Sequence, residues 1–165
     1  MKPSAIVPFT QWAFIHRNEK FISVEPISGY RMTLREDEGY VIYLPPDATD
    51  DALGRALLEA LDRSRFINPH TEGGFFEAER IVRSDRNWHK DFMRRYGYKT
   101  LRAAYKNMNW CRATRTEGRI SIKPHRRHRP RYWTDLPRDR VVVIAATTDA
   151  AVAGAALRLA LDRCE

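Results

Sequence analysis

Alternating apolar and polar positions predict a strand at a similar place in each half of the chain. Residues 21–25 and 119–123 both alternate with a period of two, which is typical of a strand with one buried face. Turn-forming residues at 18–19 and 117–118 come just before them. Each strand is therefore expected to pair with the segment that precedes its turn, as a β-hairpin.

Continuous apolar runs, each followed by a helical pattern, come next in both halves. Residues 41–44 and 141–146 are largely apolar, and we expect them to be central strands covered on both faces. In residues 50–64 and 150–164 the apolar side chains recur at three- and four-residue spacings, as on one face of an amphipathic helix. The pattern therefore predicts a strand followed by a helix, twice.

The two strand-and-helix blocks also match in residue identity. Residues 41–65 and 141–165 align without a gap at an offset of 100. The residues of the first block that meet an identical residue in the second are Val41, Gly54, Ala56, Leu57, Ala60, Leu61, Asp62 and Arg63. Two copies are too few for a solenoid, so a duplicated core is the natural interpretation.

We therefore expect an α+β fold made of internally duplicated units, each with a strand hairpin, a central strand and a helix. The units span about 10–66 and 109–165, and a helical connector at about 67–108 joins them. A chain of 165 residues with 43% hydrophobic residues is enough for one such sheet-and-helix domain over residues 1–165.

Two glycines stand at the same register inside the expected helices. Glycine within a helix costs roughly 1 kcal/mol relative to alanine, so the repeated use of Gly54 and Gly154 predicts close packing on the sheet or on the other helix. Thr49 and Asp149 precede the helices and carry the side-chain acceptors that suit an N-cap.

The connector has helical signals of its own. Residues 75–82 and 88–96 carry apolar side chains at helical spacings, and Gly97 suits a C-terminal stop. Thr100 can then cap a short helix over residues 101–107. We expect these helices to join the two units.

Positive charge is concentrated in the middle of the chain. The net formal charge is −4 over residues 1–82, +13 over 83–140 and −1 over 141–165, which gives +8 in total. Residues 125–140 contain two prolines, many arginines and no periodicity, which predicts an exposed loop. A surface this basic suits an acidic protein face or nucleic acid, but it can also be solvated with no partner.

No group of residues has the spacing of a catalytic or cofactor site. His125 and His128 have ligand-like spacing, but a structural zinc needs about four ligands and a catalytic zinc about three. Cys111 and Cys164 match no ligand spacing, and we expect small core residues rather than a disulfide. Phosphate-loop and nucleophile motifs are absent from the sequence. We expect no enzyme activity, no metal and no cofactor.

Two groups of residues have the chemistry of a protein-binding surface. The first combines guanidinium groups with aromatic rings, and its members are Arg129, Arg131, Tyr132 and Trp133. Such residues dominate interface hot spots, yet they also suit single-stranded nucleic acid, and the two aromatic rings can instead fold back as a lid over the sheet. The second group presents carboxylates to a basic partner, and its members are Glu36, Asp37 and Glu38.

The expected compartment is the cytoplasm. No run approaches the roughly 18 apolar residues that a membrane span requires. The first 8 residues carry one positive charge and two prolines, which is not the pattern of a secretory signal. We therefore expect no membrane association.

Three segments resemble one family of immunity proteins from bacterial contact-dependent growth inhibition systems. The first, residues 93–108, reads MRRYGYKTLRAAYKNM, and residues 53–67 and 155–164 carry the other two. The segments recur in the family's order. Together with the strand matches, the resemblance runs over most of residues 10–165.

The resemblance implies a cytoplasmic protein encoded beside a toxin that neighbouring cells deliver. Such a protein binds the C-terminal toxin domain, often a nuclease, in a one-to-one complex, and it has no catalytic residues of its own. The basic charge departs from the acidic surface of an inhibitor that fills a nuclease cleft. Docking away from the active site, use of the acidic first half and an acidic toxin all stay open, and a basic nucleic-acid-binding module is the competing interpretation.

Overall fold

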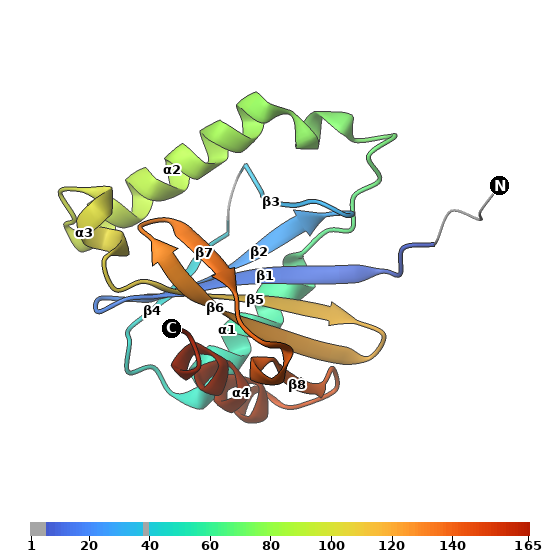
Figure 1. Ribbon diagram of the computed structural model, residues 1–165. Coiled ribbons are helices and arrows are strands. Elements are labelled where there is room, and N and C mark those ends of the chain that lie inside the picture. Colours follow the sequence, from blue (N-terminus) through green and yellow to red (C-terminus); the bar gives the residue numbers. More distant parts are fainter. Residues whose placement is uncertain (1–5, 38–39) are drawn as a thin grey trace.

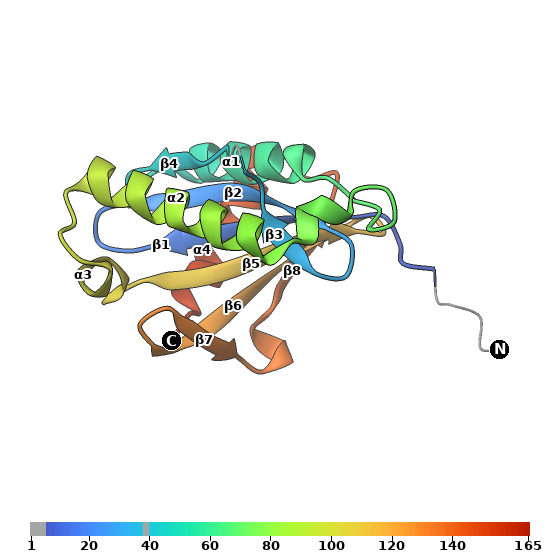
Figure 2. The same ribbon diagram turned by 90° about the horizontal axis from the view of Figure 1, so that it is seen from above.

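A computed structural model describes residues 6–37 and 40–165 of the chain. Eight antiparallel strands form a curled sheet, with helices α1 and α4 side by side on one face and the long helix α2 across part of the other (Figure 1; Figure 2). The α+β class expected from the sequence is confirmed.

The strands follow the order β3-β2-β1-β5-β6-β7 across the sheet, while β4 pairs with β2 and β8 pairs with β6. Their bounds are β1 Thr10–Arg17, β2 Ile22–Gly29, β3 Thr33–Arg35, β4 Ile42–Leu44, β5 Asn109–Thr116, β6 Arg119–Arg129, β7 Tyr132–Asp135 and β8 Val142–Ala145. The two hairpins expected from the alternating segments, β1–β2 and β5–β6, are confirmed, and β1 pairs with β5 at the centre.

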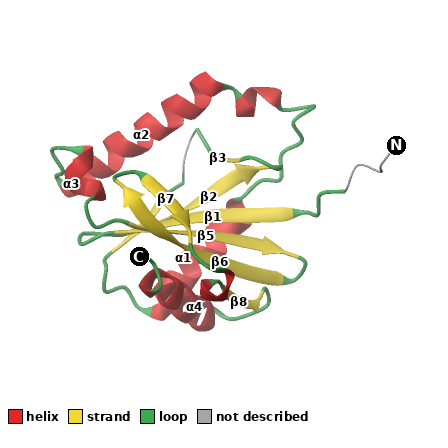
Figure 3. Cartoon of the chain, viewed as in Figure 1, coloured by secondary structure: helices red, strands yellow, loops and turns green. Residues whose placement is uncertain are grey.

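The sequence predicts the start of α1, α3 and α4 and the end of α2 from their caps; Figure 3 shows the helices in red. Their bounds are α1 Asp50–Arg63, α2 Ala78–Tyr96, α3 Leu101–Tyr105 and α4 Ala150–Asp162, with short 3-10 helices at Gly73–Phe76 and Arg138–Arg140. Thr49 and Asp149 each accept a hydrogen bond from the backbone N–H three residues on, and Thr100 does the same for α3. Gly97 ends α2 with φ 68°, a left-handed conformation that glycine adopts without strain.

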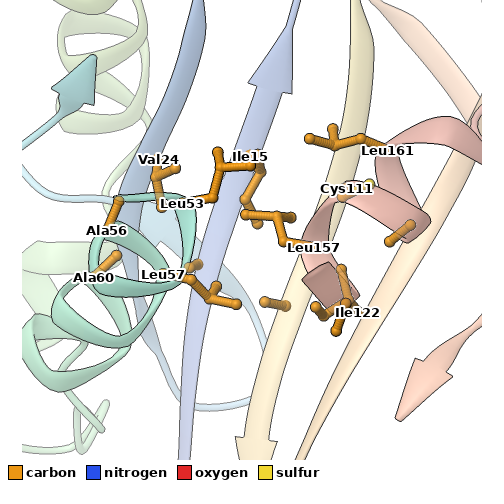
Figure 4. Packing of buried hydrophobic residues seen from close by; sticks show 14 of the residues in the cluster. Ile15, Val24, Leu53, Ala56, Leu57, Ala60, Cys111, Ile122, Leu157 and Leu161 are labelled. Carbon is orange, nitrogen blue, oxygen red and sulfur yellow. The ribbon is translucent and has the colours of Figure 1, made fainter. Parts of the chain in front are cut away.

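The main hydrophobic core lies between the sheet and the α1–α4 pair (Figure 4). Alternate residues of the strands supply the sheet side of this core, because side chains along a strand point to opposite faces in turn. Its fully buried members include Ala13, Ile15, Ile22, Val24, Leu57, Cys111, Ile120, Ile122, Leu157 and Leu161. Burial of each large aliphatic side chain contributes about 1.5–3 kcal/mol, so this layer is the main stabilising element.

Gly54 and Gly154 lie where α1 and α4 cross. A Cβ atom on Gly54 would overlap the backbone carbonyl of Ala150, and one on Gly154 would overlap the backbone carbonyl of Asp50. The close packing expected from the repeated glycine is confirmed, and its partner is the other helix. Each helix thus has its glycine against the first turn of its neighbour.

The apolar runs at 41–44 and 141–146 were expected to be central strands, and this is wrong. β4 and β8 lie at the edges, since β4 pairs only with β2 and β8 only with β6 among the described residues. Ile42 and Ile144 pack on the main core, whereas Val143 is 54% exposed. An apolar run indicates that a strand contacts a hydrophobic layer, and here helices supply that layer. It does not indicate how many strands lie beside that strand in the sheet.

The connector and the basic segment also differ from expectation. Residues 78–96 form one continuous helix instead of two, with a 3-10 turn before it. The expected loop at 125–140 is largely a hairpin, because β6 continues to Arg129 and pairs with β7. Arginine carries a long apolar stem below its charge, so charged residues on both faces of β6 conceal the strand's period of two.

Four strands and then a long helix occur twice in the chain, as β1–β4 with α1 and as β5–β8 with α4. β1 and β5 pair with each other, β2 and β6 flank them, and β4 and β8 flank those in turn. The segment with α2 and α3 lies between the two sets. The same order of elements thus occurs on both sides of the segment with α2 and α3.

Gly54→Ala should lower the free energy of unfolding by roughly 1–3 kcal/mol, because a methyl group at the crossing forces the two helices apart. Gly73→Ala is the matched control, since a Cβ at Gly73 meets nothing within 4 Å, and its effect should stay within about 0.5 kcal/mol. Urea denaturation measures both values. An unchanged midpoint for Gly54→Ala would contradict the packing role.

Candidate functional site

A cavity of about 470 Å³ opens on the sheet face opposite to α1 and α4. We call it the aromatic cavity. The sheet, helices α2 and α3, and the β6–β7 hairpin enclose it, and its lining residues are Phe14, His16, Arg35, Asp85, Trp88, His89, Tyr105, Trp110, Pro130, Arg131 and Trp133. Four other cavities have volumes of about 190 to 420 Å³.

The alternation of side chains along β1 and β5 determines which residues form the floor of the cavity. Ala13 and Ile15 are buried against α1 and α4, so Phe14 and His16 project from the other face of the sheet. His16 is directly opposite Trp110 in the β1–β5 register. The same two strands thus supply the main core on one face and an aromatic floor on the other.

The aromatic rings of the cavity are in mutual contact. The Trp110 ring lies 5.6 Å from Trp133 and 5.1 Å from Phe14, measured between centroids. His16 lies 4.8 Å from Trp88, and Tyr105 lies 5.8 Å from Trp133. Such pairs add about 0.5–1.5 kcal/mol beyond the burial of their area, so β7 is held against the cavity by ring contacts.

A buried charge pair fixes the side of the cavity next to β3. Arg35 donates two hydrogen bonds to the Glu25 carboxylate, at 2.8 and 2.7 Å, and Glu25 is fully buried. Arg35 also pairs with Asp85 of α2, and its guanidinium lies 4.2 Å from the centroid of the Trp88 ring. A guanidinium held by two carboxylates and one ring is fixed in position.

The histidines of the cavity are neutral at pH 7. Burial lowers the pKa of His16 well below its usual value, and the positive charge of Arg35 adds to this effect. Burial and Arg35 also lower the pKa of His89 to about 4. The Nε2 atom of His89 is 2.8 Å from the Tyr105 hydroxyl, and this contact orients both rings.

Several nitrogen atoms around the cavity have no hydrogen-bond partner among the described residues. They are the indole Nε1 atoms of Trp88, Trp110 and Trp133 and the Nδ1 atom of His16. An indole nitrogen can only donate, and leaving a buried donor unpaired costs about 1–3 kcal/mol. These nitrogen atoms have almost no accessible surface, so a ligand in the cavity would meet the aromatic rings and charged groups that line it.

The structure separates the first group of expected binding residues. Arg131 and Trp133 line the aromatic cavity, so Trp133 folds back over the sheet as a lid. Tyr132 is 56% exposed and Arg129 is exposed beside it on the hairpin. Arg131 adopts φ 66° in the turn that joins β6 to β7.

The second, acidic group does not reach the aromatic cavity. Glu36 accepts hydrogen bonds of 2.7 and 2.9 Å from Arg65. Asp37 pairs with Arg80 at 3.2 Å and with Arg83 at 3.3 Å. Glu38 lies outside the described residues. The two described carboxylates are thus engaged in ion pairs within the protein.

The histidines and cysteines that were considered as metal ligands have different surroundings in the described chain. Within residues 6–37 and 40–165, no three histidine, cysteine or acidic side chains are placed to hold a metal ion. His125 is buried under Trp110, with ring centroids 4.0 Å apart, whereas His128 is exposed. Cys111 and Cys164 are both free thiols. Among the described helices, none is long and apolar enough to cross a membrane.

Sequence reasoning missed most of the cavity. The missed residues include Phe14, His16, Arg35, Trp88 and Trp110. One signal was available in β1, where Trp12, Phe14 and His16 alternate with apolar residues, so that both faces of the strand carry rings or aliphatic groups. Which of these rings meet α2 and the β6–β7 hairpin is decided by the tertiary structure.

Solved structures with the same fold include a toxin–immunity complex. The chain matches a chain of the CdiA-CT/CdiI toxin and immunity complex from Yersinia pseudotuberculosis with a TM-score of 0.89 and 32% identity, over 95% of this chain and 98% of that one. It also matches NMB0488 of Neisseria meningitidis, a protein of unknown function, with a TM-score of 0.89 and 28% identity over 98% and 99% of the two chains.

Sequence comparison leads to the same family. The immunity protein CdiI-YPIII of Yersinia pseudotuberculosis serotype O:3 (strain YPIII) is 34% identical over 168 aligned positions, which cover 93% of this chain and 95% of the relative. The family model described as CDI immunity protein matches residues 11–164. The chain belongs to the CdiI family of CDI immunity proteins.

Proposed function

We propose that this protein works in the cytoplasm, where it binds and neutralises a cognate toxin domain in a one-to-one complex without catalysis of its own. Membership of the CdiI family and the similarity to a chain from a toxin–immunity complex support this function. We further propose that the toxin is a nuclease encoded beside this protein, as the family resemblance implies.

We infer that the aromatic cavity and the outer face of the β6–β7 hairpin contact the toxin. The observation that carries this inference is the cavity itself, which is lined by Trp88, Trp110, Trp133 and Arg131. A toxin side chain that enters the cavity would gain apolar contact with these rings, and a carboxylate on it could pair with Arg131.

Charge favours the hairpin over the acidic group as the contact surface. Arg129 and Arg131 form no ion pair with any other described residue, whereas Glu36 and Asp37 are already paired with arginines. Free guanidinium groups can pair with an acidic face of a partner at no cost in internal contacts. We therefore propose that the toxin docks with an acidic surface, away from the basic cleft of a nuclease.

A nucleic-acid-binding module is supported less well by the same segment. Arg126 pairs with Glu165 at 2.5 Å, and Arg127 donates to the backbone carbonyl of Tyr105 at 3.0 Å. Two members of the arginine run thus hold the fold together instead of tracking a phosphate backbone. Nucleic-acid binding is therefore an outcome that the toxin experiment can reveal, not the function proposed.

We propose in addition that an internal duplication produced the fold, as one domain over residues 1–165. The matched order of elements, the identity of 41–65 with 141–165 at eight positions, and the reciprocal contacts of Gly54 and Gly154 support this origin. A duplicated unit also accounts for the near-equal environments of α1 and α4.

The purified protein should bind the toxin domain encoded next to it with a dissociation constant of about 10 nM or below, near −11 kcal/mol. Traces of toxin must be captured inside the cell, which requires affinity of this order. Calorimetry measures affinity and stoichiometry, and growth of cells that express the toxin measures protection. No toxin binding, together with salt-dependent binding of single-stranded RNA, would favour the nucleic-acid module.

Arg131→Glu should raise the dissociation rate of the toxin complex at least tenfold, about 1.4 kcal/mol, because it places a negative charge at the cavity mouth. Trp133→Phe keeps an aromatic ring but removes part of its contact area, so a roughly threefold to tenfold loss of affinity is expected. Arg55→Glu is the charge-matched control, since the Arg55 side chain is 75% exposed on α1. Surface plasmon resonance measures the rates, and melting temperatures establish that each variant is folded.

The acidic group provides the opposing test. Glu36→Gln should leave the dissociation rate within about twofold, a change of roughly 0.4 kcal/mol, because Glu36 is occupied by Arg65. If Glu36→Gln weakens binding while both hairpin variants bind as the parent does, the contact surface lies on the acidic side.

A further inference from the structure

The two cysteines of the chain are neighbours in space although 53 positions separate them in the sequence. Cys111 lies in β5 and Cys164 follows the end of α4. Their Sγ atoms are 3.5 Å apart, and both are free thiols. A disulfide requires a separation of about 2 Å, so an approach of about 1.5 Å, shared between two side chains, would join them.

The two thiols differ in access and in acidity. Cys111 is fully buried in the main core, and burial raises its pKa well above the usual value. Cys164 is less buried, and a hydrogen bond with the Cys111 thiol lowers its pKa to about 7, despite partial burial. A thiolate is the reactive form of cysteine, so Cys164 is the thiol that meets a reagent from solvent.

Cys164 belongs to the segment that ties the C-terminal residue to the sheet. The Glu165 N–H donates to the carbonyl of His125 at 3.2 Å, and the Arg127 N–H donates to the carbonyl of Glu165 at 2.6 Å. The Cys164 thiol lies 3.4 Å from the carbonyl oxygen of Trp110, a residue of the cavity floor. A covalent bond here would join the end of α4 to the strand beneath the aromatic cavity.

We propose that Cys111 and Cys164 form a site of reversible disulfide formation, with a low-molecular-weight disulfide such as glutathione disulfide as the oxidant. The Cys164 thiol loses its proton, and its sulfur attacks one sulfur of glutathione disulfide. The glutathione S–S bond breaks, and one glutathione leaves as a thiolate that takes up a proton. Cys164 then carries a mixed disulfide with the second glutathione.

Cys111 completes the reaction from its buried position. Its thiol gives up a proton, its sulfur attacks the Cys164 sulfur of the mixed disulfide, and the second glutathione leaves and is protonated. Two protein thiols are oxidised, and one glutathione disulfide is reduced to two glutathione molecules. In a reducing cytoplasm the thiols stay free. Under oxidising conditions the bond closes a loop of 53 positions and constrains the unfolded chain.

The experiment treats the reduced full-length protein with glutathione disulfide and measures its intact mass under denaturing conditions. The expected product is a monomer lighter by two hydrogens, with a melting temperature roughly 5–10 °C higher than the reduced form. Dithiothreitol should reverse both changes. A product that stays fully reduced, or that forms only intermolecular dimers, would overturn the proposal.

Single substitutions separate the roles of the two thiols. Cys111→Ala and Cys111→Ser should each retain one glutathione on Cys164, because no second thiol can release it. Cys164→Ser should stay unmodified, because Cys111 is buried. Circular dichroism establishes which variants are folded. If no variant is folded, the change in mass of the parent protein alone decides the proposal. Glutathione retained on Cys111 in Cys164→Ser would reverse the proposed order of attack.

Discussion

The close contact between α1 and α4 is the constraint on which the rest of the structure depends. Gly54 and Gly154 let each helix lie against the backbone of the other, so that both helices fit over the same face of the sheet. The leucines at equivalent positions, Leu57 and Leu157, then reach the central strands together. Because successive side chains of a strand point to opposite faces, every second side chain of β1 and β5 projects from the face opposite to these helices.

The opposite face is where the molecule differs from a simple two-layer fold. The helices α2 and α3 and the β6–β7 hairpin cover it, and between them lies a cavity lined by rings and by a fixed guanidinium. An open cavity leaves aromatic surface without protein contacts in the isolated molecule. A partner side chain that enters the cavity would bury that surface, which is the physical basis of the proposed contact with the toxin.

Family membership supports the proposed function, and the proposed contact surface would select the partner. The chain shares 34% identity with CdiI-YPIII and a TM-score of 0.89 with the chain from the Yersinia complex, so the backbone is retained while most side chains differ. Hot-spot contacts depend on a few side chains. Differences confined to the hairpin and the cavity rim would therefore change the toxin that is recognised without a change of fold.

Local signals in the sequence determined the hairpins, the two amphipathic helices and their caps, because a period of two, a period near 3.6 and an N-cap acceptor are properties of neighbouring residues. They also predicted the close packing at Gly54 and Gly154. Only the tertiary structure decided that β4 and β8 are edge strands, that residues 125–135 form a hairpin, and that His16, Trp88 and Trp133 meet in one cavity. Alternation shows that a strand has two faces, but which elements cover each face depends on contacts between residues far apart in the chain, and no local pattern encodes those contacts.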